Sequence, residues 1–259
     1  MEYIQCGEPC KSQWNALAGV KLRERGLSSF DTLSRAGGLF VEGYYVRVSE
    51  LLSRIPRILK ASRRYIVLAT GLFLMGIAAG ASVFYYNPLD ASQLLLLLDR
   101  KFGPMTRSMA RLSIPHMAGL VFWNNLKATG LLIAGGIAFG ILPMIMVFIN
   151  GLVVGMVSGD VIRQGFGLFP FILVGILPHG VFEIPAYILG GTLGIRLGFN
   201  ILGYERGRQH GQGLKVIVID TLIVLAIVLI PLLAIASLVE VSVTRQLVEW
   251  VMGDALRWH

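Results

Sequence analysis

The feature that most limits the fold is a run of 22 residues without a charged side chain, Tyr65 to Tyr86. As a helix this run is about 33 Å long, which is enough to cross a hydrocarbon layer of about 30 Å. Arg63 and Arg64 precede the run, and Tyr85 and Tyr86 end it, as expected where a span meets the two membrane interfaces. The sequence therefore predicts a transmembrane helix here.

Three further apolar segments follow, at residues 126–157, 169–202 and 214–239. The last has the length of one simple span, with a kink expected at Pro231. The first two are each too long for one upright crossing and too short for two, because a span needs about 20 residues. The composition agrees with a membrane protein, since 15% of the residues are charged against about 25% in soluble domains.

We call 126–157 and 169–202 the first and second awkward segments, because neither length suits a whole number of spans. Prolines and glycines near their middles are expected to interrupt them, because proline removes a helical hydrogen bond. We expect 126–157 to form two short helices, or a span and a re-entrant arm, and 169–202 to be broken near its centre. The residues concerned are Pro143 in the first segment and Pro178, Gly180 and Pro185 in the second. The predicted fold class is an all-α, polytopic transmembrane helix bundle of about five spans, with broken or re-entrant helices and amphipathic interfacial helices.

The charges predict how the chain is divided and oriented. Residues 1–64 carry eleven Lys or Arg against six acids, so the positive-inside rule places this region, together with the loop 196–215, in the cytoplasm. The bundle is expected over 65–240 and includes an extracytoplasmic amphipathic loop at 87–125. Residues 241–259 are expected to form a C-terminal tail. The predicted location is the plasma membrane, with several passes.

The N-terminal region carries no recognisable binding motif. The first apolar run begins near Tyr65, too deep in the chain for a cleaved leader. An apolar stripe over 38–60 predicts an amphipathic helix. Cys6 and Cys10 are interpreted as reduced thiols, because the other half of a metal or redox site is missing. No nucleic-acid partner is expected, since no nucleic-acid-binding motif accompanies the positive charge, whereas anionic membrane lipids suit it.

Small residues four apart recur in four segments of the chain. Such pairs let helix backbones approach closely, within one chain or across a dimer. The series comprises Gly76 and Gly80, Gly136 and Gly140, Gly151, Gly155 and Gly159, and Gly190, Gly194 and Gly198. It predicts a tightly packed bundle and a homodimer.

The most unusual residues are His179 and Glu183, which lie in otherwise apolar sequence. Ionisable groups at membrane depth are costly and usually face one another, a cavity or a partner, and a spacing of four places both on one helix face. In one interpretation they pair with each other and stabilise the segment. In another they bind a divalent metal, most simply zinc, completed by His116 or Asp160. A proton or ion pathway is a third.

No catalytic residue is assigned, because the chain lacks the HExxH of zinc proteases and the GxSxG of serine hydrolases. Asn150 precedes Gly151 within the first awkward segment. Its side chain is expected to cap a short helix or to form a hydrogen bond across the bundle. Asn125 is interpreted as an interface residue, next to Asn124 and Trp123.

Several of these residues together resemble the stage II sporulation protein M family of integral membrane proteins. The resemblance covers about residues 60–240, and its most specific element is the stretch from Pro178 through His179 and Gly180 to Glu183. The other matching elements are Phe122 to Ala128, Gly135-Gly136, Asn150-Gly151 with Gly155, Pro185-Ala186, and Gly190-Gly191 with Gly194. It singles out Asn125, Asn150, His179 and Glu183.

The resemblance implies a non-enzymatic scaffold, because sporulation members of this family hold two peptidoglycan-degrading partners during engulfment of the forespore. We therefore expect a membrane scaffold that recruits or regulates partners of the cell envelope. Two alternatives stay open: a transporter or permease-like subunit with an ion site in broken helices, and a zinc-dependent membrane hydrolase. The small number of polar residues in the apolar segments favours the scaffold.

Overall fold

The computed structural model describes residues 38–41, 44–87, 112–165, 167–203 and 213–252, with a few positions between 89 and 100. From residue 38 the described chain forms β1 (Gly38–Val41), β2 (Tyr44–Arg47), α3 (Val48–Tyr86), α5 (Ile114–Ala134), the 3₁₀ turn η2 (Gly135–Ile137) and α6 (Ile141–Arg163). It continues with α7 (Leu168–Phe171), η3 (Ile172–Ile176), α8 (Leu177–Ile201), α9 (Leu214–Val224), η4 (Leu225–Leu229), α10 (Ile230–Val239), η5 (Glu240–Thr244) and α11 (Arg245–Met252). Cys6, Cys10, the last seven residues and much of the expected loop 87–125 lie outside the described residues.

A short antiparallel hairpin replaces the first part of the helix expected over 38–60. Strands β1 and β2 pair from Gly38 with Arg47 to Val41 with Tyr44, and α3 begins directly afterwards. The expectation of helix is therefore wrong for residues 38–41 and 44–47 and confirmed from Val48 onward. Aromatic and β-branched residues dominate these strands, and such residues favour extended backbone, which here outweighs the helical spacing of the apolar side chains.

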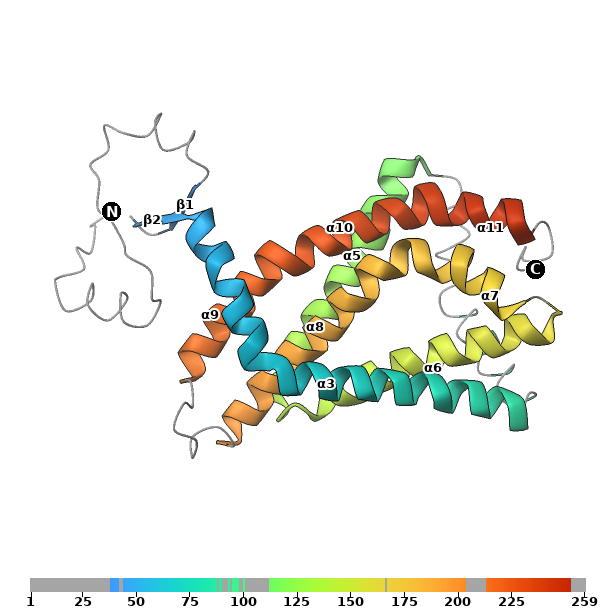
Figure 1. The fold of residues 1–259 in the computed structure, drawn as a ribbon, viewed down its shortest axis with the longest axis horizontal. Helices are drawn as coiled ribbons and strands as arrows, with labels where there is room; N and C mark the ends of the chain where they lie inside the picture. The colour runs from blue at the N-terminus through green and yellow to red at the C-terminus, as the bar shows by residue number, and fades with distance from the viewer. Residues whose placement is uncertain are drawn as a thin grey trace.

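Helix α3 joins the expected amphipathic region and the first predicted span into one element of 39 residues. It bends in its N-terminal part, and the remainder runs beside α6 along the long axis of the molecule (Figure 1). Pro56 lies inside the helix, where it lacks an N–H to donate. The predicted span 65–86 lies wholly within this helix.

Helices α3 and α6 touch through their backbones at glycines. A Cβ atom added to Gly151 would fall on the backbone oxygen of Phe73, and one added to Gly155 on that of Ile77. The contact is reciprocal, because a Cβ at Gly76 would meet the backbone of Phe148. Glycines from two of the four predicted segments therefore form one close contact between α3 and α6 within a single chain, which we call the glycine seam.

The first awkward segment contains two helices, α5 and α6, separated by a tight turn. The turn follows η2, where Phe139 and Gly140 have φ values of 57° and 80°. Pro143 lies beyond this turn, in the first helical turn of α6, where its missing N–H costs little. The turn packs against α8, since a Cβ at Gly198 would collide with the backbone of Gly140.

The second awkward segment differs from expectation, because α7, η3 and α8 form one helical stretch from residue 168 to 201. A π-helical turn, η3, takes the place of the expected break. Pro178 lacks an N–H for the carbonyl of Val174, which lies inside that turn. Local π bonding lets a membrane helix keep its backbone groups paired around a proline.

The last apolar segment also extends further than expected. Helix α9 passes through η4 into α10 without a break. Pro231 follows the π turn η4 in the same way that Pro178 follows η3. The helix does not end near Val239 but continues through η5 and α11 to Met252. Part of the expected tail 241–259 is therefore helical, and Glu240 lies within a continuous stretch rather than at its end.

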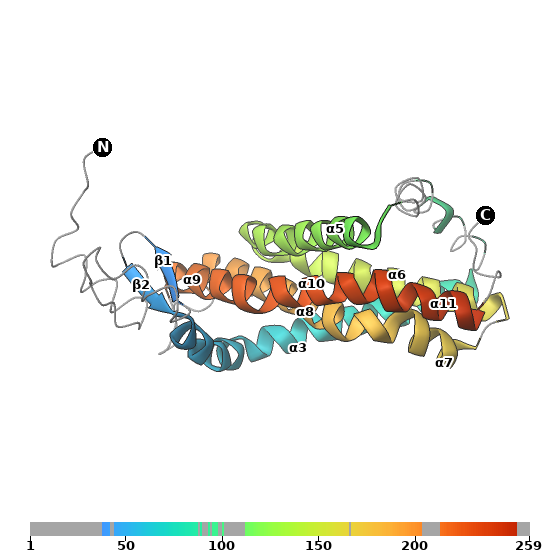
Figure 2. The ribbon, with the colours of Figure 1, turned by 90° about the horizontal axis from the view of Figure 1, so that it is seen from above.

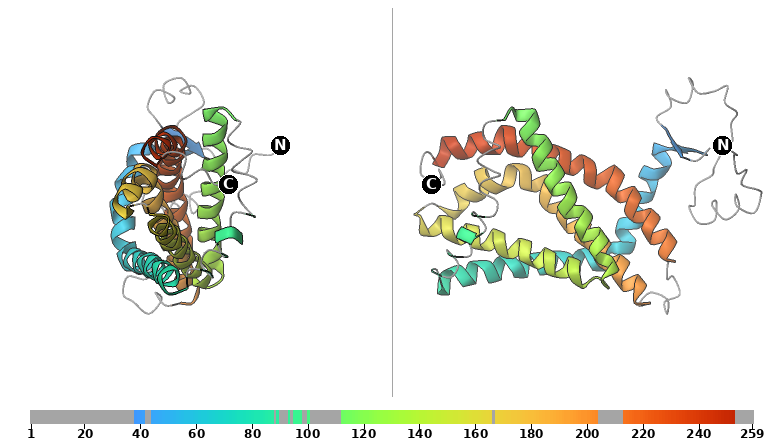
Figure 3. Two further views of the ribbon diagram at one scale, coloured as in Figure 1. Left: turned by 90° about the vertical axis from the view of Figure 1, so that its right-hand side faces the viewer. Right: turned by 180° about the vertical axis from the view of Figure 1, so that it is seen from behind.

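Among the described residues, four helical stretches are long and apolar enough to cross a membrane: 49–86, 141–163, 168–201 and 214–248. The all-α transmembrane bundle is confirmed, with four such stretches in place of about five spans. Helix α5 is not among them, and it runs obliquely across one side of the bundle against α8 and α10 (Figures 2 and 3). Many large apolar side chains on these helices are exposed, a surface suited to contact with lipid.

The seam predicts a contrast between two glycines of α3. Replacing Gly76 with alanine is expected to lower the free energy of unfolding by about 1–3 kcal/mol, as overpacking does, because the new methyl group meets the backbone of α6. Gly71→Ala is the matched control, since no atom lies within 4 Å of its added Cβ. Thermal unfolding of the purified protein in detergent measures both; equal melting temperatures would contradict the seam.

Candidate functional site

His179 and Glu183 lie one turn apart near the start of α8. The distance from His179 Nε2 to Glu183 Oε2 is 4.0 Å, and the two side chains are 19% and 30% exposed. The expectation that a spacing of four places both on one helix face is therefore confirmed. Both are partly shielded from the surface, and each keeps an atom available to a ligand.

Glu240 joins this pair from the last helical stretch. One potential ligand atom from each of His179, Glu183 and Glu240 lies within 4.8 Å of the other two. The opposite side of the imidazole contacts the same stretch, because His179 Nδ1 is 3.2 Å from the hydroxyl oxygen of Thr244. We call His179, Glu183 and Glu240 the HEE group.

Helical geometry explains why Glu240 and Thr244 both face His179. They open and close η5, a single π-helical turn. Neither η5 nor its flanks contain a proline, so the cause that accounts for η3 and η4 does not apply here. Single π turns inside α-helices occur often at functional sites. The local backbone therefore adds to the side-chain geometry in marking this place.

The two residues considered as completing ligands lie elsewhere. His116 is exposed near the start of α5, with its Nδ1 atom 2.7 Å from the hydroxyl oxygen of Ser113. Asp160 accepts a hydrogen bond of 2.7 Å from Gln164 on the next turn of α6. Neither belongs to the HEE group. The sequence analysis missed Glu240 because this residue directly follows the predicted span 214–239. The sequence did contain a clue, since Glu240 is one of only two acidic residues in 214–248.

The other polar residues singled out by the sequence have structural positions. Asn150 lies in the middle of α6 and shares a side-chain hydrogen bond with Tyr187 of α8, so the expected bond across the bundle is confirmed and the cap is not. Tyr187 also donates to the carbonyl of Met146 at 3.3 Å. Asn125 is half-buried on α5. Gly180 is buried against the side chains of its own helix.

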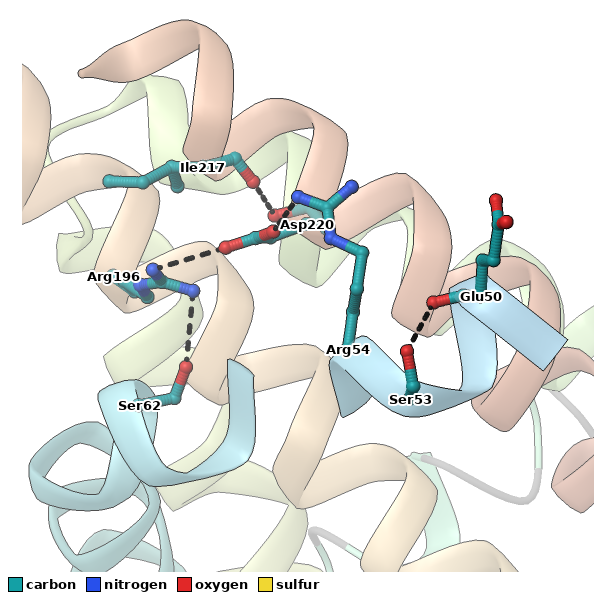
Figure 4. A network of polar contacts seen from close by, with 8 residues as sticks. Glu50, Ser53, Arg54, Ser62, Arg196, Ile217 and Asp220 are labelled. Atoms are coloured by element: carbon teal, nitrogen blue, oxygen red, sulfur yellow. Dashed lines mark hydrogen bonds and ion pairs between the residues drawn. The ribbon is translucent and has the colours of Figure 1, made fainter. Parts of the chain in front are cut away.

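A second polar cluster, which the sequence analysis did not predict, joins three helices near the other end of α8 (Figure 4). Asp220 of α9 accepts contacts of 3.4 Å from Arg196 of α8 and 3.4 Å from Arg54 of α3. Arg196 also donates to the hydroxyl of Ser62 on α3 at 3.3 Å. Arg196 and Asp220 are 1% and 3% exposed, so these charges compensate one another inside the protein.

The two clusters can do different chemistry. The Arg–Asp cluster has its carboxylate engaged by two guanidinium groups, which suits a structural clamp. The HEE group has two carboxylates facing one imidazole. Like charges so close repel, so this group requires a proton or a cation between its members. Imidazole and carboxylate are also the ligand types that bind divalent transition metals.

The clamp predicts a large effect from a substitution that keeps the side-chain volume. Asp220→Asn is expected to lower the free energy of unfolding by about 3–5 kcal/mol, because it removes the buried negative charge that two guanidinium groups engage. Asp160→Asn is the matched control, since that carboxylate contacts Gln164 on its own helix. Unfolding in detergent or in lipid discs measures both, and equal losses would show that the clamp is not structural.

Comparison with known proteins places this chain in a family. The chain is 30% identical over 132 residues to an uncharacterized protein of Methanocaldococcus jannaschii, MJ0793; the match covers 51% of this chain and 73% of that protein. No solved structure matches the chain. The family described as stage II sporulation protein M matches residues 69–245, which include the whole HEE group and both charged partners Arg196 and Asp220. The chain is a membrane protein that belongs to the stage II sporulation protein M family.

Proposed function

We propose that this protein is a non-enzymatic membrane scaffold whose helix α5 binds partners of the cell envelope. The observation that carries the proposal is one exposed face of α5. Trp123 and Leu131 on this face are 56% and 53% exposed, and Asn124 and Lys127 are exposed between them. The opposite face is buried against the bundle.

The position of α5 makes this exposure costly in a bilayer. The helix packs along α8 and α10, beside stretches that are long and apolar enough to span (Figure 2). An amide or ammonium group facing lipid tails is unfavourable, and such groups usually face protein or water. A partner that covers Asn124 and Lys127 with acceptor groups, and Trp123 with apolar surface, removes this cost.

The interior of the bundle supports a scaffold over a transporter. Its long helices meet backbone to backbone at the glycine seam. Asp220 and Arg196 pair with each other, and Asn150 bonds with Tyr187, so these polar groups serve contacts between helices. A transporter would use such groups to bind its solute near the midplane. The proposed scaffold has several passes in the plasma membrane, with its N-terminus in the cytoplasm.

Site-specific photo-crosslinking in native membranes tests whether the exposed face of α5 binds a partner. A photoreactive residue at Trp123 or Lys127 is expected to give one protein adduct of defined mass. The same residue at Val67, which is 71% exposed on α3, is expected to react with lipid. An adduct of twice the chain mass identifies a homodimer, and a larger or smaller one an envelope partner. Lipid products alone at all three positions would contradict the proposal.

A zinc-dependent hydrolase is the second candidate function, and the HEE group is the observation that favours it. A hydrolase needs a metal with an open coordination position. In complementation of a deletion strain, the scaffold proposal predicts that loss of function follows loss of the Trp123 adduct, as in the paired variant Asn124→Leu and Lys127→Leu. The hydrolase predicts loss of function in Glu183→Gln with the adduct intact.

A further inference from the structure

We infer that the HEE group is a binding site for one divalent transition-metal ion, zinc in the first instance, which joins α8 to the last helical stretch. The site consists of His179 Nε2 and one carboxylate oxygen each from Glu183 and Glu240. The inference is independent of partner binding by α5, because the residues involved are different.

The distances fit a metal more closely than they fit a simple ion pair. Ligands about 2.0–2.1 Å from a tetrahedral zinc ion lie about 3.3 Å from one another. The three ligand atoms already lie within 4.8 Å of one another, so small rotations of the two glutamate side chains bring all of them onto one ion. The direct contact from His179 to Glu183, at 4.0 Å, is longer than a hydrogen bond.

The charge of the group points the same way. Two carboxylates and one neutral imidazole bring a charge of −2, which a divalent cation balances. The HEE group lies among apolar side chains of stretches long enough to span a membrane, where uncompensated charge is unfavourable. The guanidinium groups of Arg54 and Arg196 do not serve here, because they engage Asp220.

Thr244 supplies the orientation that a histidine ligand needs. Metal-binding histidines usually donate their second ring N–H to a fixed acceptor, which sets the tautomer and the ring plane. The Thr244 hydroxyl oxygen is 3.2 Å from His179 Nδ1 and can accept that N–H, which leaves the lone pair of Nε2 for the ion. The π turn η5 presents both Glu240 and Thr244 to the same imidazole. Three protein ligands leave a fourth position for water.

Metal analysis of the purified full-length chain tests the site. With an affinity tag that contains no histidine, elemental analysis after zinc loading is expected to find about one zinc ion per chain. Glu240→Gln and His179→Gln are each expected to reduce bound zinc at least tenfold. Two matched controls, Asp160→Asn and His116→Gln, are expected to keep it, because neither residue belongs to the HEE group.

Spectroscopy identifies the ligands directly. X-ray absorption of the zinc-loaded wild-type protein is expected to show a shell of one imidazole nitrogen and oxygens. A shell containing sulfur, lost in the double variant Cys6→Ser and Cys10→Ser, would assign the zinc to the N-terminal cysteines and overturn the inference. Wild-type protein without zinc after loading, or Glu240→Gln with an unchanged amount, would also overturn it.

A stability measurement keeps the test decisive if a variant folds poorly. Zinc is expected to raise the melting temperature of chelator-treated wild-type protein and to leave that of Glu240→Gln unchanged, since binding stabilises only a state that contains the site. If neither variant can be purified, the wild-type zinc titration and the absorption spectrum decide alone.

Discussion

The backbone contact between α3 and α6 is the interaction on which the rest of the bundle depends. Glycines on both helices let the main chains touch, so that a methyl group at Gly151 or Gly76 would overlap the backbone of the facing helix. Lipid tails are as apolar as the helix surfaces, so close packing replaces hydrophobic burial as a driving force in a bilayer. Helix α8 packs in the same way against α5 and the turn after η2. A methyl group at Gly194 would meet the backbone of Leu132, and one at Gly198 the backbone of Gly140.

Helix α8 connects two polar clusters of different character. His179 and Arg196 are 17 residues apart on it, which corresponds to about 26 Å of helix. Near Arg196, opposite charges from three helices compensate one another, and the cluster is nearly inaccessible. Near His179, two carboxylates converge on an imidazole and the side chains are partly exposed. One end of α8 is thus clamped, and the other presents groups that can bind a cation.

The described residues include three π-helical turns, and these are of two kinds. Two of them precede a proline and include the residue whose carbonyl that proline cannot serve, as with Val174 and Pro178. The third, η5, has no proline and presents Glu240 and Thr244 to His179. The first two are explained by backbone chemistry, whereas η5 is explained by the side chains it positions. Helix α5 adds a separate feature, an exposed face that carries both apolar and polar side chains on the outside of the bundle.

The sequence alone determined the features that depend on local composition. Uninterrupted apolar runs predicted the long helices, because hydrocarbon excludes charge. The four-residue spacing placed His179 and Glu183 on one face, and the glycine series predicted close packing. Only the tertiary structure decided which distant groups meet. It brought Glu240 to His179 in place of His116 or Asp160, and Arg54 and Arg196 to Asp220. These contacts depend on how far each helix continues and on how it is rotated about its axis. Packing at glycines and the π turns set both, and the local pattern of apolar and polar residues does not record them.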